Sequence, residues 1–181
     1  MTPPVIIDYG RGNLHSVHRA FGGEVTADPA KIKNASHIIL PGVGAFADCR
    51  ERIAPLREAL HRTVYENGVP FLGICVGAQL MTTRSYENGV HEGFGWIDSE
   101  VVAIPGKAPH MGWNDIESTH PLFITGEHFY FVHSYHFDTG IAFCGGITAA
   151  VAKDNMVGVQ FHPEKSQENG RRFIERFLLR K

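Results

Sequence analysis

The chain has 181 residues, 43% of which are hydrophobic, and a formal net charge of −2 with histidine neutral. This length suits one domain with a sizeable hydrophobic core, so we expect residues 1–181 to form a single domain. Acidic and basic residues are interspersed, which argues against nucleic acid or an anionic membrane surface as the main partner.

The N-terminal stretch MTPPVIIDYG lacks the basic region and long apolar run of a signal peptide, and no segment is apolar over enough residues to span a bilayer. We therefore expect a cytoplasmic protein with no membrane partner. The three cysteines, Cys49, Cys75 and Cys144, are far apart and form no Cys-x-x-Cys pair. This spacing argues against both a disulfide framework and a cysteine-rich zinc site.

Strand-like and helix-like segments alternate in the first half of the chain. The apolar runs PVIID, HIILPG and VPFLGI are typical of short buried strands. Helices are predicted over residues 13–21, 47–67 and 77–86, with Gly68 as a C-terminal stop and a kink at Pro55. This alternation predicts an α/β fold in which helices cover both faces of a parallel sheet.

The second half of the chain is richer in β-structure. After Gly89, four segments have strand-like patterns with few helical periods between them: GWIDSEVVAI, HFYFVHSYHF, GGITAAVA and MVGVQF. We expect these segments to add antiparallel strands. Residues 167–180 carry apolar side chains on one face and basic ones opposite, which predicts a closing amphipathic helix.

Cys75 lies in the sequence Gly73-Ile74-Cys75-Val76-Gly77, which has the form Gly-x-nucleophile-x-Gly. A strand that turns abruptly into a helix presents such a residue outward, and the flanking glycines remove Cβ atoms that would block the turn. The helix N-terminus would also favour a thiolate. The pentapeptide alone equally supports a small buried cysteine at a tight junction, so a neighbouring base is needed to decide.

His162 is the best candidate for that base. It follows an apolar strand in VGVQFHPEKS, with Pro163 stiffening the chain and Glu164 two positions on. A carboxylate there can bind one imidazole nitrogen while the other faces a thiol, so Cys75, His162 and Glu164 are predicted to form a catalytic triad. The other histidine pairs lack an evident third ligand, and we predict no metal site.

Two glycine-containing turns are candidate binding loops. LPGVGAF follows the second apolar strand, and its backbone N–H groups near Gly42 to Gly44, with that of Val76, could stabilise an oxyanion. The alternative is an ordinary Pro-Gly turn. The first loop, DYGRGNLHS, lacks the third glycine of a dinucleotide-binding fingerprint, so we reject NAD and predict no cofactor.

Six segments together resemble the class I glutamine amidotransferases, and most specifically the glutaminase subunits of imidazole glycerol phosphate synthase: IIDYGRGNLHSV, IILPGVGAF, PFLGICVGAQLM, PHMGWN, YFVHSYH and GVQFHPEKSQ. The resemblance covers nearly the whole chain. It implies the flavodoxin-like fold of class I glutamine amidotransferases, with a mixed, mainly parallel central sheet flanked by helices and added antiparallel strands in the second half.

The resemblance also implies an activity and a substrate pocket. The triad of Cys75, His162 and Glu164 would hydrolyse L-glutamine to glutamate and ammonia through a γ-glutamyl thioester. The pocket residues implied are Gly42, Val43, Gly44 and Val76 around the oxyanion, Gln79 and Glu87 at the glutamine head group, and His133, Ser134 and Tyr135 at its remaining wall. For Glu87 the alternative is a solvated residue in the loop SYENG.

A partner is implied as well. Glutaminases of this family work as heterodimers with a (β/α)8-barrel cyclase, which uses the ammonia to make imidazole glycerol phosphate and AICAR in histidine biosynthesis. The residues that would face the cyclase are Asn13, His110, Met111, Trp113, Asn114 and Lys165. Trp113 suits an interface anchor, although a core tryptophan in a hairpin is the alternative.

The chain departs from the family at Ala78, where methionine is more usual, and the lost volume could loosen packing behind the elbow. Three rival functions remain open from the sequence. The chain could serve another synthase, such as pyridoxal phosphate synthase, although PHMGWN argues against this. It could be a noncatalytic subunit, although all three triad residues are present. It could also be a cysteine peptidase or deglycase, which would not need Gln79 and Glu87.

Overall fold

The computed structural model describes residues 2–180. Its central sheet contains these strands: β1 (Val5–Ile7), β2 (Glu24–Thr26), β3 (Ile38–Leu40), β4 (Phe71–Ile74), β9 (Glu117–Ser118), β12 (Ala142–Cys144), β13 (Ile147–Lys153) and β14 (Met156–Val159). They lie in the order β2-β1-β3-β4-β14-β13-β12-β9. The neighbours from β2 to β14 pair in parallel, and those from β14 to β9 pair antiparallel. The predicted mixed sheet is therefore present, with β14 joining its parallel part.

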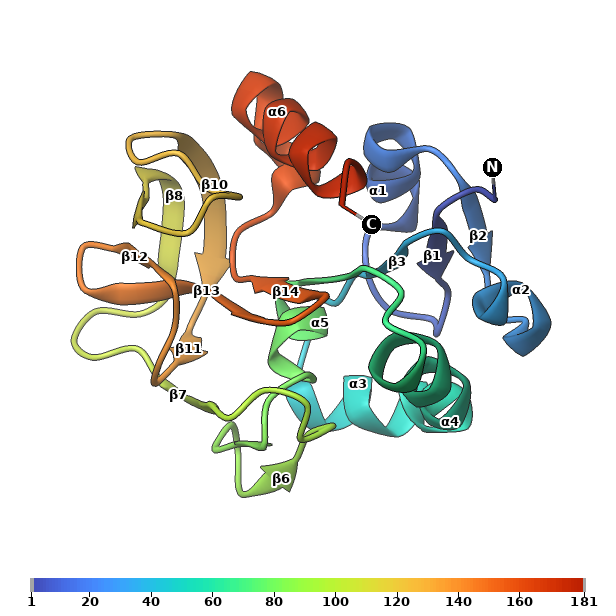
Figure 1. The fold of residues 1–181 in the computed structure, drawn as a ribbon. Helices are drawn as coiled ribbons and strands as arrows, with labels where there is room; N and C mark the ends of the chain where they lie inside the picture. Colours follow the sequence, from blue (N-terminus) through green and yellow to red (C-terminus); the bar gives the residue numbers. More distant parts are fainter. Residues whose placement is uncertain (1, 181) are drawn as a thin grey trace.

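The helices and helical turns are α1 (Leu14–Phe21), α2 (Pro29–Lys33), α3 (Phe46–Ile53), η1 (Ala54–Leu56), α4 (Arg57–Leu60), η2 (His61–Glu66), α5 (Val76–Gln79), η3 (Pro163–Lys165) and α6 (Gln167–Leu178). Figure 1 shows α1 and α6 on one face of the sheet, with α3 and α4 on the other. The predicted three-layer arrangement is confirmed. Among residues 2–180, no helix is long and apolar enough to cross a membrane.

Two smaller sheets complete the second half. The strands β8 (His110–Asp115) and β10 (His128–His133) form an antiparallel hairpin. The other sheet has the order β11-β7-β5-β6, built from β5 (Arg84–Ser85), β6 (His91–Glu92), β7 (Glu100–Ala103) and β11 (Tyr135–Phe137). The β8–β10 hairpin lies beside β13, in the antiparallel part of the central sheet (Figure 1).

Two predicted helices differ from the structure. The helix predicted over residues 77–86 is wrong beyond Gln79, because Arg84 and Ser85 pair with β7 instead and tertiary pairing overrides local propensity. The helix predicted over residues 47–67 is interrupted at Pro55 by the 3-10 turn η1 and continues through α4 into the π-helical turn η2. Proline has no N–H to donate, which explains the break there.

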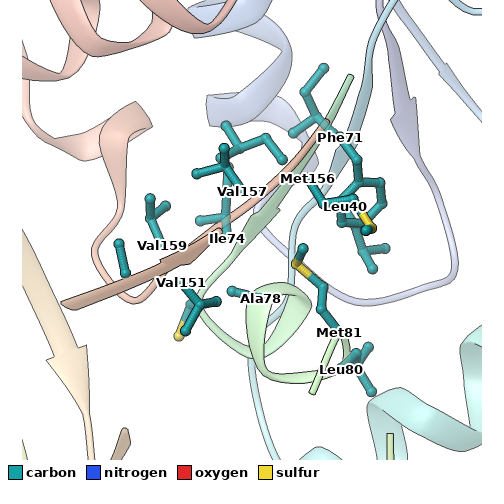
Figure 2. Close-up of a cluster of buried hydrophobic side chains, with 14 of the residues drawn as sticks. Leu40, Phe71, Ile74, Ala78, Leu80, Met81, Val151, Met156, Val157 and Val159 are labelled. Atoms are coloured by element: carbon teal, nitrogen blue, oxygen red, sulfur yellow. The ribbon is translucent and has the colours of Figure 1, made fainter. Parts of the chain in front are cut away.

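The buried apolar side chains form one connected core cluster that includes residues from Val5 to Phe177. Figure 2 shows the part of this core at α5, where Ala78 lies beside Val151 and below Ile74 and Val157. Ala78 is fully buried, and a Cβ built on Gly158 would lie only 3.0 Å from the Ala78 Cβ. The small side chain at position 78 therefore packs directly against the backbone of β14.

Gly77 marks the closest approach between α5 and the central sheet. A Cβ built on Gly77 would lie 2.0 Å from the carbonyl oxygen of Leu40, the last residue of β3. Backbone atoms cannot move aside as the end of a flexible side chain can. Only glycine fits here without displacing the helix.

We predict that Gly77→Ala lowers the free energy of unfolding by about 2 kcal/mol or more, because the added methyl group collides with the β3 backbone. Urea denaturation measures the loss. The control is Gly126→Ala, where a Cβ meets nothing within 4 Å and only the positive φ of 90° opposes the substitution. Equal losses in the two variants would contradict this account of the Gly77 contact.

Candidate active site

Cys75 lies at the turn between β4 and α5, where the sequence predicts an abrupt strand-to-helix junction. Its φ of 54° falls in the left-handed region, which is strained for a residue with a side chain. A Cβ on Gly73 would lie 2.6 Å from the Ala78 Cα, so glycine is needed there as well. The backbone N–H of Cys75 donates to the Val159 carbonyl at 2.8 Å, which ties the turn to β14.

His162 and Glu164 form a buried pair beside Cys75. His162 Nδ1 donates to Glu164 Oε1 at 2.8 Å, and the two side chains are only 3% and 2% exposed. Burial alone would lower the pKa of His162, but its hydrogen bonds with Cys75 and Glu164 outweigh that effect and raise the pKa to about 9. Because Nδ1 is held by Glu164, the free nitrogen that faces the thiol is Nε2.

A neighbouring strand and turn fix the His162 backbone. Its N–H donates to the Tyr130 carbonyl on β10 at 2.9 Å, and its carbonyl accepts from the Ser166 hydroxyl at 2.6 Å. The second carboxylate oxygen of Glu164 is buried and finds no hydrogen-bond partner among the described residues. The pair is thus held rigidly, with one acceptor site of Glu164 unused.

Cys75 and His162 open onto a cavity of about 300 Å³. Its walls contain eight of the predicted pocket residues: Val43, Gly44, Val76, Gln79, Glu87, His133, Ser134 and Tyr135. Gly42 lies beneath the wall, where an added Cβ would come within 2.4 Å of the Gly77 nitrogen. Pro109 and Val132 also line the cavity and were not predicted.

The loop after β3 carries the predicted oxyanion donors. The Tyr9 hydroxyl donates to the Pro41 carbonyl at 2.8 Å, and the Cys49 thiol donates to the Val43 carbonyl at 3.5 Å. Gly44 has a φ of 104°, which suits glycine alone. Val76, as the first residue of α5, has no acceptor for its N–H within the helix. The loop is therefore anchored at both ends, with a helix N-terminus opposite.

Two buried glutamines connect the cavity wall to the sulfur. Gln79 Nε2 donates to the Tyr135 carbonyl at 3.4 Å and to Gln160 Oε1 at 3.1 Å. Gln160 Nε2 in turn donates to Cys75 Sγ at 3.6 Å. The sequence prediction missed Gln160, which lies just beyond the end of β14, where no strand periodicity indicates the direction of its side chain.

Glu87 is half-buried at the cavity wall rather than freely solvated. Its Oε2 accepts from the Phe46 N–H at 2.7 Å, at the first residue of α3. The N-cap residue of that helix, Ala45, makes no side-chain cap bond. Glu87 therefore caps α3 from another part of the chain through Oε2. Its Oε1 makes no hydrogen bond among the described residues and can accept from a cation.

Three polar side chains predicted at the partner face or pocket form an internal chain. Asn114 Nδ2 donates to His110 Nε2 at 2.9 Å, His110 Nδ1 donates to His133 Nε2 at 2.7 Å, and His133 Nδ1 donates to the Tyr135 carbonyl at 2.8 Å. Burial lowers the pKa of His133 to about 4, so its ring is neutral at pH 7. His110 and Asn114 thus hydrogen-bond toward the pocket while staying partly exposed, and their place at the partner face stays a prediction.

The other predicted partner residues are exposed. Met111 is 61% and Trp113 46% exposed, on the face of β8 opposite His110, so a core position for Trp113 is excluded. The Trp113 and Tyr130 rings lie 6.1 Å apart, and Lys165 Nζ lies 6.0 Å from the Tyr130 ring centre. Asn13 lies at the N-terminus of α1, where its side chain accepts from the Ser16 N–H at 3.3 Å.

Among residues 2–180, no group of three or more His, Cys, Asp or Glu side chains is arranged to hold a metal ion. The chemistry that this arrangement offers is nucleophilic: a thiol, an imidazole with an orienting carboxylate, and backbone donors around one cavity.

The sequence matches the family model of class I glutamine amidotransferases over residues 5–181. It is 44% identical to the imidazole glycerol phosphate synthase subunit HisH of Cereibacter sphaeroides, over 96% of this chain and 97% of the relative. It is 46% identical to the HisH subunit of Zymomonas mobilis, over 96% of this chain and 93% of the relative. The HisH subunit of Mesorhizobium japonicum is also 46% identical, over 96% of each.

The fold is shared with solved structures of lower identity. A crystal structure of a glutamine amidotransferase superposes with a TM-score of 0.76 at 18% identity, over 96% of this chain and 98% of the other. A Thermotoga maritima glutamine amidotransferase gives 0.64 at 16% identity, over 96% and 81%. These superpositions confirm the predicted fold. The chain therefore belongs to the class I glutamine amidotransferases and, within them, to the family of HisH subunits of imidazole glycerol phosphate synthase.

Proposed function

We propose that this chain is a glutaminase subunit that hydrolyses L-glutamine to glutamate and ammonia and passes the ammonia to a cyclase subunit in histidine biosynthesis. The observation that supports it best is the junction of Cys75 with the buried His162–Glu164 pair on one cavity of about 300 Å³. The names of the HisH relatives support the biosynthetic assignment.

In the first half of the reaction, Cys75 Sγ attacks the side-chain amide carbon of glutamine while His162 Nε2 holds the thiol proton. The carbonyl oxygen becomes an oxyanion, for which backbone N–H groups of the Gly42 to Gly44 turn and of Val76 are the proposed donors. When the C–N bond breaks, His162 gives its proton to the departing nitrogen. Ammonia and a γ-glutamyl thioester on Cys75 result.

In the second half, a water molecule attacks the thioester carbon and His162 Nε2 takes its proton. The C–S bond breaks, the proton returns to the sulfur, and glutamate leaves. Glu164 holds the imidazole in the required orientation through Nδ1 and stabilises its charged form in both halves. One water is consumed for each ammonia released.

The head group of glutamine is proposed to bind at the wall formed by Glu87, Gln79 and Tyr135. The free carboxylate oxygen of Glu87 is suited to the α-ammonium group, because a cation removed from water needs a charged partner. The backbone from His133 to Tyr135 would contribute further hydrogen-bonding groups. The tautomers of His133 and His110 are set by the hydrogen bonds that run from Asn114 to the Tyr135 carbonyl.

The partner is proposed to be a (β/α)8-barrel cyclase that docks on a cluster formed by exposed Met111, Trp113 and Lys165 and half-buried Tyr130. This cluster combines a large aromatic anchor with a cation at its edge, the composition of an interface hot spot. One of its members, Tyr130 on β10, also accepts the backbone N–H of His162. Docking there would place the ammonia source against the partner and keep ammonia from escaping into water.

We predict that the purified chain releases glutamate from glutamine strongly only when a histidine-pathway cyclase and its nucleotide ligand are both present. Glutamate release, measured by an enzyme-coupled assay, should disappear in Cys75→Ala while the complex with the cyclase still forms. Undiminished release by Cys75→Ala would remove the thiol from the mechanism. Release with a different synthase partner, but not with the cyclase, would reassign the pathway.

We predict that Glu164→Gln lowers kcat for glutamate release at least about 100-fold, because His162 loses the charge that orients it and stabilises its protonated form.

The same variant changes how the free energy of unfolding depends on pH. The pKa of His162 is about 9 in the folded chain against about 6.5 for an unperturbed histidine, so its stabilising contribution is fully present below pH 6.5 and is lost as pH rises through 9.

The size of that loss is about 3 kcal/mol, at about 1.4 kcal/mol per pKa unit. Glu164→Gln should therefore flatten the fall in unfolding free energy between pH 6.5 and 9, as measured by urea denaturation at several pH values. Cys75→Ala removes the other interaction that raises the pKa of His162 and should flatten the slope at least as much. A slope equal to wild type in Glu164→Gln would contradict the assigned cause.

We predict that Trp113→Ala raises the Kd for the cyclase roughly tenfold or more, because an exposed tryptophan in the proposed docking cluster is typical of a hot spot. Isothermal titration calorimetry measures the change. The matched control is Phe143→Ala on β12, an aromatic side chain that is 41% exposed against 46% for Trp113. If both variants bind alike, the docking face is elsewhere.

A further inference from the structure

Gln160 is a fully buried amide that the proposed mechanism does not use. It follows β14 directly, and its backbone N–H donates to the Ala149 carbonyl at 2.8 Å. The next side chain, Phe161, points into the core, where its ring stacks on Phe129 at 4.0 Å. The side chain of Gln160 instead reaches the sulfur, with its Nε2 at 3.6 Å from Cys75 Sγ.

The orientation of both buried amides follows from one carbonyl. The Tyr135 oxygen can only accept, so the atom of Gln79 that contacts it at 3.4 Å must be the amide nitrogen. The same nitrogen contacts Gln160 at 3.1 Å, which must therefore present its oxygen. Gln160 is left with its nitrogen toward Cys75 Sγ at 3.6 Å, where it can only donate.

Two consequences follow for the reaction. A donor at the sulfur stabilises a thiolate more than a thiol or a thioester, which favours both the attacking state of Cys75 and its departure from the thioester. Because both hydrogens of the Gln79 amide are already engaged, only its oxygen remains for a ligand in the cavity. That oxygen selects a substrate group that carries an N–H donor, as an ammonium or an amide does.

We propose that Gln160 is a positioning residue for this reaction: its amide donates to the Cys75 sulfur and locks Gln79 with its oxygen toward the substrate. The role at Gln79 rests on the proposed glutaminase function. The role at the Cys75 sulfur concerns the thiol alone and can be tested without glutamine or a partner.

Gln160→Met keeps the length of the side chain and removes both hydrogen bonds. The first measurement is the rate of iodoacetamide alkylation of the chain against pH, corrected with Cys75→Ala, which retains Cys49 and Cys144. We expect the midpoint for Gln160→Met to move to higher pH by about one unit, the scale of one hydrogen bond to a charged group. A folded Gln160→Met with the wild-type midpoint would overturn the proposal.

Gln160→Glu separates the two contacts, since its carboxylate can still accept from Gln79 but cannot donate to the sulfur when ionised. In the glutaminase assay with the activating partner, we expect KM for glutamine to rise roughly tenfold in Gln160→Met and to stay within about threefold of wild type in Gln160→Glu. Equal KM values in the two variants would overturn the role assigned at Gln79. A purely structural role would lower thermal stability and leave the midpoint and KM unchanged.

If Gln160→Met does not fold, Gln160→Asn replaces it, because its shorter amide no longer reaches the sulfur. Failure of the proposed function gives a distinct result. In that case the alkylation midpoint still shifts in the variants, while the wild-type chain releases no glutamate in any partner complex.

Discussion

The contact between α5 and the ends of β3 and β4 is the constraint on which the rest of the site depends. Cys75 keeps its positive φ only because the helix that follows lies directly against the central sheet, with Gly77 facing the Leu40 carbonyl. Gly42, in the loop after β3, lies equally close to α5, since an added Cβ would come within 2.4 Å of the Gly77 nitrogen. A single close approach of backbone to backbone thus sets the direction of the sulfur, the first turn of α5 and the wall of the cavity.

The buried polar groups around this elbow are organised by what each can accept or donate. The Tyr135 carbonyl receives His133 on one side and Gln79 on the other, and Gln79 then determines the orientation of Gln160 toward Cys75. Burial holds His133 neutral, whereas Glu164 and Cys75 hold His162 positive. The low dielectric of the interior strengthens each of these bonds and makes an alternative arrangement costly.

Much of the fold could be predicted because its signals are local. Apolar runs, periodic helices and the Pro55 break are all properties of neighbouring residues, and the structure confirms β1, β3, β4, α1 and α6. The failure after Gln79 has a specific cause: Arg84 and Ser85 pair with Glu100 and Val101 of β7, which lie 16 positions further along the chain. The hydrogen bonds that link Asn114 to His110 and His110 to His133 were not predicted, because strand register decides which side chains meet.

The sequence by itself determined the chemical groups of this protein and the family to which it belongs, since a nucleophile between glycines and a His-x-Glu element are readable in linear order. Only the tertiary structure decided how Gln160 and Glu87 are used. Gln160 reaches Cys75 across parallel strands, and Glu87 caps a helix 41 residues away in sequence. Hydrogen bonds depend on distance and direction in space, and residue spacing carries neither for groups so far apart along the chain.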